Sequence, residues 1–124
     1  MKVKPRILIV DDRLENLVAL EKTLADMDVD FIRAMSGNEA LAATLEDEFA
    51  LALVDVQMPG MDGYEAIHYI REQERFSDLP ILALTAKAMV DDREKCIAAG
   101  ANDYMPKPVD VDRLLSLIRV WLYK

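Results

Sequence analysis

Five strand-like runs recur along this chain, and a helix-like segment follows each of them. Three of the runs, residues 6–10, 50–54 and 81–84, are almost continuously apolar, which is typical of strands buried on both faces. Two shorter or more polar runs, residues 29–34 and 103–105, complete the set. Strict alternation of buried strands with helices predicts an α/β fold, in which helices cover both faces of one parallel sheet.

Capping residues and apolar periodicity set the expected helix boundaries. Asp12 is available as the cap of the first helix, and Ser36 followed by Glu39 has the spacing of a capping box, as does Asp62 followed by Glu65. Gly100 suits the left-handed residue that ends many helices. The predicted helices run over residues 13–26, about 37–47, from Asp62 onward, about 89–99, and from 111 to the C-terminus.

The strand order is predicted from the common doubly wound topologies. With five strands, the order 2-1-3-4-5 places the first and third strands side by side, where the winding reverses. The run at residues 6–10 is expected to be central, and the more polar run at 29–34 to lie at an edge. A length of 124 residues matches one ordinary domain, so residues 1–124 are predicted to form a single domain.

Net charge and the length of the apolar runs exclude several classes of function. The formal charge of -8, from 15 Lys and Arg against 23 Asp and Glu, argues against direct nucleic-acid binding, because phosphate backbones need cationic patches. The apolar runs are far shorter than the ~20 residues that span a bilayer, and residues 1–6 lead straight into a strand. We therefore expect no membrane insertion and no export, which predicts a cytoplasmic location.

Residues suited to phosphoryl chemistry follow the strand-like runs. Asp11 and Asp12 follow the first run, Asp55 the third, Thr85 the fourth and Lys107 the fifth. The carboxyl ends of parallel strands share one edge of a sheet, where open α/β sheets bind their ligands. Three carboxylates gathered there would repel one another, which favours a bound proton or a bound cation. Oxygen ligands with open coordination positions favour Mg2+.

The same residues fit a phosphoryl transfer. A carboxylate can attack phosphorus to form an acyl phosphate, and Asp55 is the best candidate because it stands alone at the end of its run. The acidic pair after the first run can chelate a metal ion. Phosphoryl transfer depends on positioning and charge neutralisation, which Mg2+ and the Lys107 ammonium would supply. The Thr85 hydroxyl, aided by the backbone N–H of Ala86, would donate to a phosphoryl oxygen.

Four short motifs carry a resemblance to a known family. They are Val10-Asp11-Asp12, the run D-V-Q-M-P-G-M-D-G at residues 55–63, Leu84-Thr85-Ala86, and Y-M-P-K-P at residues 104–108. Their order, spacing and positions at strand ends closely resemble the receiver domain of two-component response regulators, and the resemblance covers essentially the whole chain. It implies a flavodoxin-like fold and a phosphorylatable switch, with a sensor histidine kinase or a histidine phosphotransfer protein as its partner.

The resemblance also implies a role for each residue of the predicted site. Asp55 is then the phosphoacceptor, and Tyr104 is an aromatic switch that turns inward when Thr85 moves toward the phosphate. An ordinary packed aromatic in an edge strand is the alternative for Tyr104. The implied Mg2+ ligands are Asp11, Asp12, Asp55 and the backbone carbonyl of Gln57, the implied phosphoryl contacts are Thr85 and Lys107, and the Lys107–Pro108 peptide bond is implied to be cis.

The implied activity is self-catalysed rather than that of a classical enzyme. A receiver catalyses its own phosphorylation from phosphohistidine and its own slow dephosphorylation. The last two helices and the last strand form the expected output surface, which is also a candidate homodimer interface. The sequence of residues 85–107 most resembles that of receivers in hybrid histidine kinases. It leaves open whether the chain is a stand-alone regulator or part of a regulator with an output domain.

Three other functions are weighed against this interpretation. A haloacid dehalogenase-like phosphatase also uses an aspartyl nucleophile and Mg2+, but it needs a second Asp two residues later, where this chain has Gln57. A flavin-binding electron carrier needs a Ser/Thr/Gly-rich loop after the first strand, whereas Asp11 and Asp12 would repel a flavin phosphate. A docking module that works without phosphate is disfavoured by the intact Asp55, Thr85 and Lys107.

Overall fold

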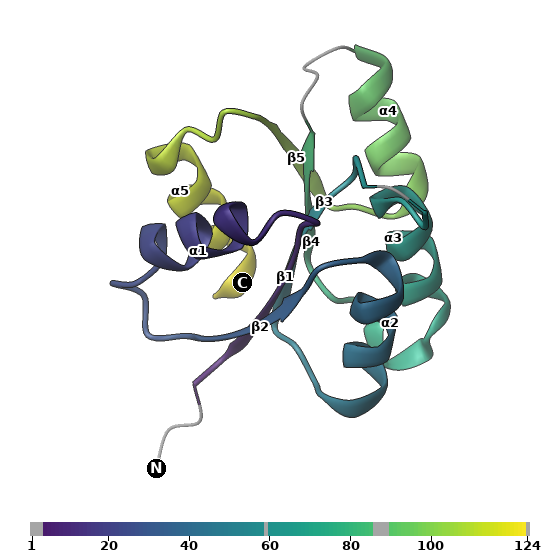
Figure 1. The fold of residues 1–124 in the computed structure, drawn as a ribbon, viewed down its shortest axis with the longest axis horizontal. Helices are drawn as coiled ribbons and strands as arrows, with labels where there is room; N and C mark the ends of the chain where they lie inside the picture. Colours follow the sequence, from purple (N-terminus) through teal and green to yellow (C-terminus); the bar gives the residue numbers. More distant parts are fainter. Residues whose placement is uncertain (1–3, 59, 86–89, 124) are drawn as a thin grey trace.

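A computed structural model describes residues 4–58, 60–85 and 90–123 of the chain, around a five-stranded parallel sheet (Figure 1). The strands are β1 (Arg6–Val10), β2 (Asp30–Ala34), β3 (Leu51–Asp55), β4 (Ile81–Thr85) and β5 (Asp103–Pro106). Their order is β2-β1-β3-β4-β5, which confirms the predicted topology. The expectation that the first strand is central was wrong, because β3 lies in the middle. Both strands are almost fully buried, so hydrophobicity alone could not rank them.

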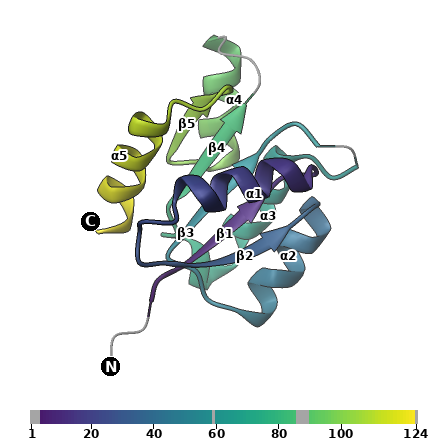
Figure 2. The ribbon, with the colours of Figure 1, turned by 60° about the vertical axis from the view of Figure 1, so that its left-hand side comes forward.

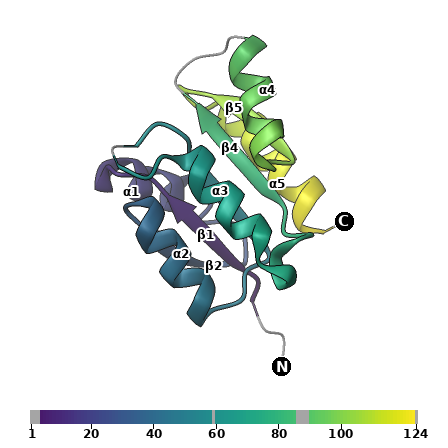
Figure 3. The same cartoon turned by 90° about the vertical axis from the view of Figure 1, so that its right-hand side faces the viewer.

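Helices cover both faces of the sheet, as the alternating pattern predicts. They are α1 (Leu14–Thr23), α2 (Gly37–Glu46), α3 (Gly63–Glu72), α4 (Val90–Ala99) and α5 (Val111–Leu122), with a 3-10 turn, η1 (Glu74–Phe76), after α3. Helices α1 and α5 lie on one face, and α2, α3 and α4 on the other (Figure 1, Figure 3). The predicted start of the fourth helix, residue 89, lies outside the described residues. Within the described ranges, no helix is both long and apolar enough to cross a membrane.

Two of the predicted helix caps form, and one does not. The side chains of Ser36 and Asp62 cap α2 and α3 as predicted. The predicted cap Asp12 of α1 is wrong, because Arg13 occupies the cap position and no side chain caps that helix. The carboxylate of Asp11 instead accepts the backbone N–H of Arg13 at 2.9 Å. The Asp11 carboxylate therefore stays at the end of β1, and neither acid caps α1.

The apolar core has two layers, one on each face of the sheet, because successive strand residues point to opposite faces. Figure 2 shows α1 crossing one of these faces. The strand residues buried in the layer that packs against α1 and α5 are Ile7, Ile9, Leu51, Leu53, Leu82, Leu84 and Met105. The strand residues buried in the other layer are Leu8, Val10, Ala34, Ala52, Val54, Ile81 and Ala83. Since both sides of β1, β3 and β4 are covered, polar side chains are confined to the places where these strands end.

Arg71 of α3 joins several elements at the end of the sheet where the strands begin. Its guanidinium donates to the carbonyl oxygens of Gly100 at 2.8 Å and Phe76 at 2.9 Å, and to the side-chain oxygen of Asn102 at 2.6 Å. The same Asn102 oxygen accepts the backbone N–H of Ile81 at 2.8 Å. Burial lowers the pKa of the Arg71 guanidinium, although arginine stays protonated in proteins. One cation therefore connects α3, η1, β4 and the segment between α4 and β5.

The end of α4 requires a glycine, as the sequence predicts. Gly100 has a φ of +116°, and its N–H donates to the carbonyl of Ile97 at 3.0 Å. The N–H of Ala101 donates to the carbonyl of Cys96 at 3.0 Å, which completes a Schellman motif. A Cβ atom on Gly100 would also lie 2.8 Å from Cγ of Arg71.

Replacing Arg71 by Met should lower the free energy of unfolding by about 3 kcal/mol, because buried acceptors would lose a charged donor. Urea denaturation of both proteins measures the difference. Arg75→Met is the matched control, since that exposed arginine makes one hydrogen bond, at 3.2 Å, to the backbone oxygen of Asp47. The control should lose less than about 1 kcal/mol. Equal losses in the two variants would show that Arg71 does not hold these elements together.

Candidate functional site

Three acidic side chains meet where β1 and β3 end. Val10 of β1 pairs with Val54 of β3, so the residues that follow these positions lie at the same level of the sheet. Carboxylate oxygens of Asp11, Asp12 and Asp55 all lie within 4.8 Å of one another. Asp11 is only 1% exposed and Asp55 only 4%, while Asp12 is half-buried. The structure thus brings the three predicted acids into one small, largely buried cluster.

Lys107 reaches this acidic cluster from the end of β5. Its ammonium lies 3.0 Å from Oδ2 of Asp11 and 3.4 Å from Oδ2 of Asp55. Its backbone N–H donates to the carbonyl of Thr85 at 2.7 Å, which fixes the start of the β5–α5 connection beside β4. The Lys107–Pro108 peptide bond is cis, as the family resemblance implies. One lysine therefore serves two buried carboxylates.

The balance of interactions leaves Asp55 short of positive charge. Burial is the main reason why its pKa is raised above the ordinary value for an aspartate, and repulsion from Asp11 adds to the rise. Two contacts oppose the shift: the backbone N–H of Gln57, which donates to Oδ1 of Asp55 at 3.0 Å, and the Lys107 ammonium. Since burial outweighs these contacts, further positive charge at this position would favour the ionised carboxylate.

A hard divalent cation fits this donor set. All three acidic residues offer carboxylate oxygens, which Mg2+ prefers over nitrogen or sulfur ligands. In the part of the chain that the structure describes, Lys107 is the only cationic side chain paired with the acidic cluster. Such an ion would add the positive charge that one shared lysine does not provide.

A glycine holds the loop after β3 close to the strand. An ideal Cβ atom on Gly63 would lie 2.2 Å from the carbonyl oxygen of Asp55 and 2.4 Å from Cα of Val56. These are backbone atoms, so a larger residue would force the start of α3 away from the end of β3. The N–H of Gly63 also donates to the carbonyl of Val56 at 3.3 Å. The glycine of the quoted 55–63 motif thus keeps Asp55 in its place.

The other predicted site residues lie on β4, on β5 and just after β3. Thr85 ends β4 and is fully buried, while the side chain of Gln57 is exposed. Tyr104 of β5 is half-buried and packs against the apolar layer on the face of α2, α3 and α4. Ala86, whose N–H the sequence argument assigns to a phosphoryl oxygen, lies outside the described residues.

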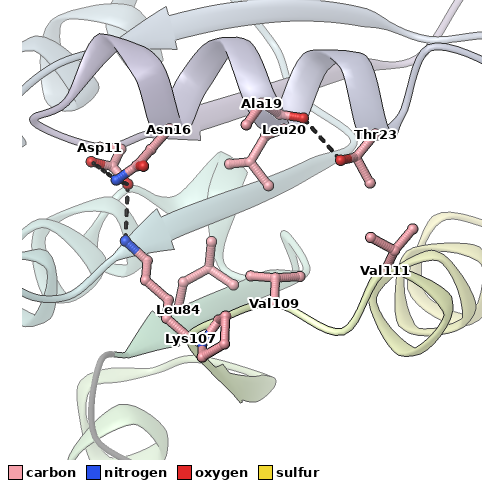
Figure 4. Close-up of a pocket in the computed structure, with 10 residues that line it drawn as sticks. Asp11, Asn16, Ala19, Leu20, Thr23, Leu84, Lys107, Val109 and Val111 are labelled. Carbon is pink, nitrogen blue, oxygen red and sulfur yellow. Dashed lines mark hydrogen bonds and ion pairs between the residues drawn. The ribbon is translucent and has the colours of Figure 1, made fainter.

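Asn16 belongs to the site and was missed by the sequence argument. Its side-chain Nδ2 donates to Oδ1 of Asp11 at 3.2 Å and to Oδ2 at 3.1 Å. A cavity of about 270 Å³ opens between α1 and the β5–α5 connection, and Asp11, Asn16 and Lys107 stand at its polar end (Figure 4). The only signal in the sequence is a polar residue in the first turn of the helix that follows the acidic pair.

Comparisons with known proteins agree on one family. The family model of the response regulator receiver domain matches residues 7–119. The sensor protein GacS of Pseudomonas syringae pv. syringae is 41% identical over 120 residues, which cover 94% of this chain and 13% of that protein. The DNA-binding dual master transcriptional regulator RpaA of Synechocystis sp. is 36% identical over 122 residues, or 95% of this chain and 49% of that protein. The chain thus spans less than half the length of either relative.

A solved structure is similar over nearly the full chain. The receiver domain of the sensor histidine kinase PA1611 from Pseudomonas aeruginosa PAO1 is 33% identical, with a TM-score of 0.90, covering 98% of this chain and 100% of that one. In that structure a magnesium ion is coordinated in the active-site cleft. Because the family match runs from β1 through β5 and includes every residue of the acidic cluster, this chain belongs to the response regulator receiver domains of two-component signalling systems.

Proposed function

We propose that this receiver is a phosphorylatable switch in which Asp55 accepts a phosphoryl group from a phosphohistidine. The donor is a sensor histidine kinase or a histidine phosphotransfer protein, and sensor kinases are among the relatives of the chain. The observation that carries the proposal is the buried Asp55 carboxylate, whose Oδ2 lies 3.4 Å from the Lys107 ammonium within a cluster of three acids. Buried and incompletely neutralised groups of this kind are typical of functional sites.

Asp55 is better suited than Asp11 to attack phosphorus. Both oxygens of Asp11 accept hydrogen bonds from Asn16, Oδ1 also accepts a backbone N–H, and Oδ2 also accepts the Lys107 ammonium at 3.0 Å. On Asp55, Oδ1 accepts the backbone N–H of Gln57, while Oδ2 has the longer contact with Lys107. The lone pairs of Asp55 Oδ2 are therefore more available than those of Asp11.

The proposed step exchanges one bond to phosphorus for another. A lone pair on Oδ2 of Asp55 forms the new P–O bond while the P–N bond to the partner's imidazole breaks. The electron pair of the broken bond stays on the imidazole, which leaves as a neutral ring when its other nitrogen carries a proton. The Lys107 ammonium and the Thr85 hydroxyl would neutralise charge on the phosphoryl oxygens, which is the main requirement of phosphoryl transfer.

We assign the proposed Mg2+ site to the carboxylates of Asp11, Asp12 and Asp55 and the backbone carbonyl of Gln57. When bound, Mg2+ would neutralise phosphoryl charge and help to align the group for transfer. The raised pKa of Asp55 supports a need for added positive charge. The magnesium ion in the active-site cleft of the similar PA1611 receiver supports the identity of the ion.

The proposed output follows from the charge that phosphorylation adds. An acyl phosphate brings a charge of about -1.5 to -2 into the acidic cluster. The Lys107 ammonium would then move from Asp11 toward the phosphoryl group, and Thr85 would move with it. We propose that Tyr104 turns inward in response, which changes the surface formed by α4, β5 and α5. That surface would bind the downstream partner or a second copy of the chain.

The other functions weighed from the sequence gain no support from the site. A dehalogenase-like phosphatase needs an acidic side chain at the position of Gln57, which is an exposed amide. The acidic cluster after β1 and β3 is also unsuited to a flavin phosphate. With no phosphatase site, the slow loss of the acyl phosphate would be catalysed by the receiver itself. A cytoplasmic location stays a prediction.

Asp55→Asn should abolish covalent labelling by acetyl phosphate in the presence of Mg2+, because an amide cannot act as the nucleophile. The parent protein should take up one phosphoryl group, which mass spectrometry of the intact protein detects. Asp28→Asn is the matched control, since that carboxylate is exposed and outside the site. Stoichiometric labelling of the Asp55 variant would refute the assignment of the phosphoacceptor.

Lys107→Ala should slow the labelling of Asp55 by about a hundredfold, because a positioned charge on the phosphoryl oxygens is lost. Given enough time, the variant should still be labelled, but the NMR signals of Tyr104 should no longer respond to labelling. Lys95→Ala is the control, because Lys95 is exposed on α4. A normal rate together with a normal Tyr104 response would exclude the proposed role of Lys107.

Mg2+ should stabilise the fold at neutral pH, by about 2.7 kcal/mol when its concentration is about 100 times its dissociation constant. The pKa of Asp55 is raised in the folded state, so protonation of this carboxyl stabilises the fold. The stability that protonation adds is complete below the pKa of the unfolded state. It is lost as the pH rises through the pKa of the folded state. Mg2+ competes with that proton, so its stabilising effect should fade as the pH falls through the same pKa. Thermal melts at several pH values measure it.

Two variants make this measurement specific to the acidic cluster. Asp55→Asn should melt at a higher temperature than the parent protein in EDTA at neutral pH, and Mg2+ should stabilise it less. Glu94→Gln, which changes an exposed acid on α4, should respond to Mg2+ like the parent. A melting temperature that does not depend on Mg2+ in the parent protein would contradict the metal assignment.

A further inference from the structure

We propose that Gly37, the first residue of α2, is a positioning residue for the reaction at Asp55. Because Gly37 has no side chain, Met61 can lie against it and hold the end of the loop between β3 and α3 in place. The inference rests on the proposed phosphorylation of Asp55 and adds to it a residue on another element, outside the acidic cluster. Gly37 acts on Asp55 through Met61 and Gly63.

Met61 lies directly against Gly37. An ideal Cβ atom on Gly37 would lie 2.8 Å from Cγ, 2.9 Å from Sδ and 2.9 Å from the carbonyl oxygen of Met61. Both the side chain and the backbone of Met61 therefore occupy the space that a larger residue would need. Among the described glycines, Gly60 and Gly100 have a positive φ, and Gly37 does not. Space, and not backbone conformation, is the reason for a glycine at this position.

The start of α2 is the fixed side of this contact. The side chain of Ser36 caps the helix by accepting the N–H of Glu39 at 3.0 Å, and the carbonyl of Ser36 accepts the N–H of Ala40 at 3.0 Å. Gly37 and Ala40 are buried, and α2 lies beside α3 on the same face of the sheet (Figure 3). Met61, in contrast, is half-buried and belongs to a loop. A side chain added at position 37 would therefore displace Met61 and not α2.

Met61 leads into the residues that hold the start of α3 against the end of β3. Asp62 caps α3 by accepting the N–H of Glu65 at 2.9 Å. Gly63 comes next, and an ideal Cβ atom there would lie 2.2 Å from the carbonyl oxygen of Asp55. The close approach of Gly63 to Asp55 thus begins two residues after Met61. A shift of Met61 away from α2 would pull on this approach and so on the backbone of Asp55.

The proposed reaction is sensitive to the position of the Asp55 carboxylate. Its Oδ1 accepts the N–H of Gln57 at 3.0 Å, and its Oδ2 lies 3.4 Å from the Lys107 ammonium. Attack on phosphorus requires the nucleophile to stay within a narrow range of positions, and a displacement of a fraction of the bond-forming distance slows the reaction. Gly37 therefore supports the rate of the reaction through the position of the nucleophile, although it contributes no side chain to the site.

Gly37→Ala should slow the labelling of Asp55 by acetyl phosphate about tenfold at saturating Mg2+, because the added methyl group displaces Met61. The half-saturating concentration of acetyl phosphate should stay close to the parental value, since the groups that would bind its phosphate are unchanged. Met61→Ala removes the Cγ and Sδ contacts without adding a clash, and it should slow labelling about threefold. The double variant should be labelled no more slowly than Gly37→Ala, because both substitutions disturb one contact. Mass spectrometry of the intact protein measures the rates.

Asn38→Ala is the matched control, because Asn38 is the exposed neighbour of Gly37 in α2 and the substitution also raises helix propensity. It should leave the labelling rate unchanged. Urea denaturation separates positioning from stability.

Three results would count against the inference. A folded Gly37→Ala variant that is labelled at the parental rate, whether or not it has lost stability, would overturn the inference and leave the proposed function intact. Slowing factors that multiply in the double variant would also overturn it, because Gly37 and Met61 would then act independently. A parent protein that is not labelled at Asp55 would overturn the proposed function together with the inference.

Discussion

The site depends on a sheet and core that keep the buried carboxylates of Asp11 and Asp55 close together, with one lysine between them. Two acids at this distance repel each other, and their burial strengthens the repulsion because little water screens it. The sheet does not allow them to separate. Residues 7–10 of β1 pair with residues 51–54 of β3 in register, and apolar layers on both faces hold the two strands. The hydrophobic core thus stabilises an arrangement of charges that is unfavourable in itself.

The two ends of the sheet are built differently, and the difference suits the proposed phosphorylation switch. Where the strands begin, Arg71 links α3, η1, β4 and the end of α4 through fixed hydrogen bonds to backbone carbonyls and to Asn102. Where the strands end, Lys107 is shared between two acids at 3.0 and 3.4 Å, so a new negative charge can redirect it. A rearrangement at the second end can therefore proceed without loosening the first.

Much of the fold and part of the site follow from the sequence, for physical reasons that can be named. Continuous apolar runs identified strands buried on both faces, and the residues after them were placed at one edge by the geometry of parallel sheets. The predicted order placed β1 correctly, and only the expectation that β1 is the central strand was wrong, because β1 and β3 are both almost fully buried. Asn16 and Arg71 were missed because their partners, Asp11 and Gly100, lie across a strand-to-helix boundary or in a distant loop. Neither periodicity nor capping rules report such contacts, which exist only once the helices pack on the sheet.

The charge balance of the site also explains why a phosphorylated state of this chain would be temporary. Adding about -1.5 to -2 of charge beside two other buried acids is unfavourable unless cations compensate it. The site offers one lysine, and the neutral Asn16 amide orients Asp11 without cancelling any charge. An acyl phosphate formed there would keep its compensation only while Lys107 and a bound Mg2+ remain in place. In the proposed function, the same shortage of positive charge that favours added cations at Asp55 would also make its phosphorylated form a high-energy state, as a decaying signal requires.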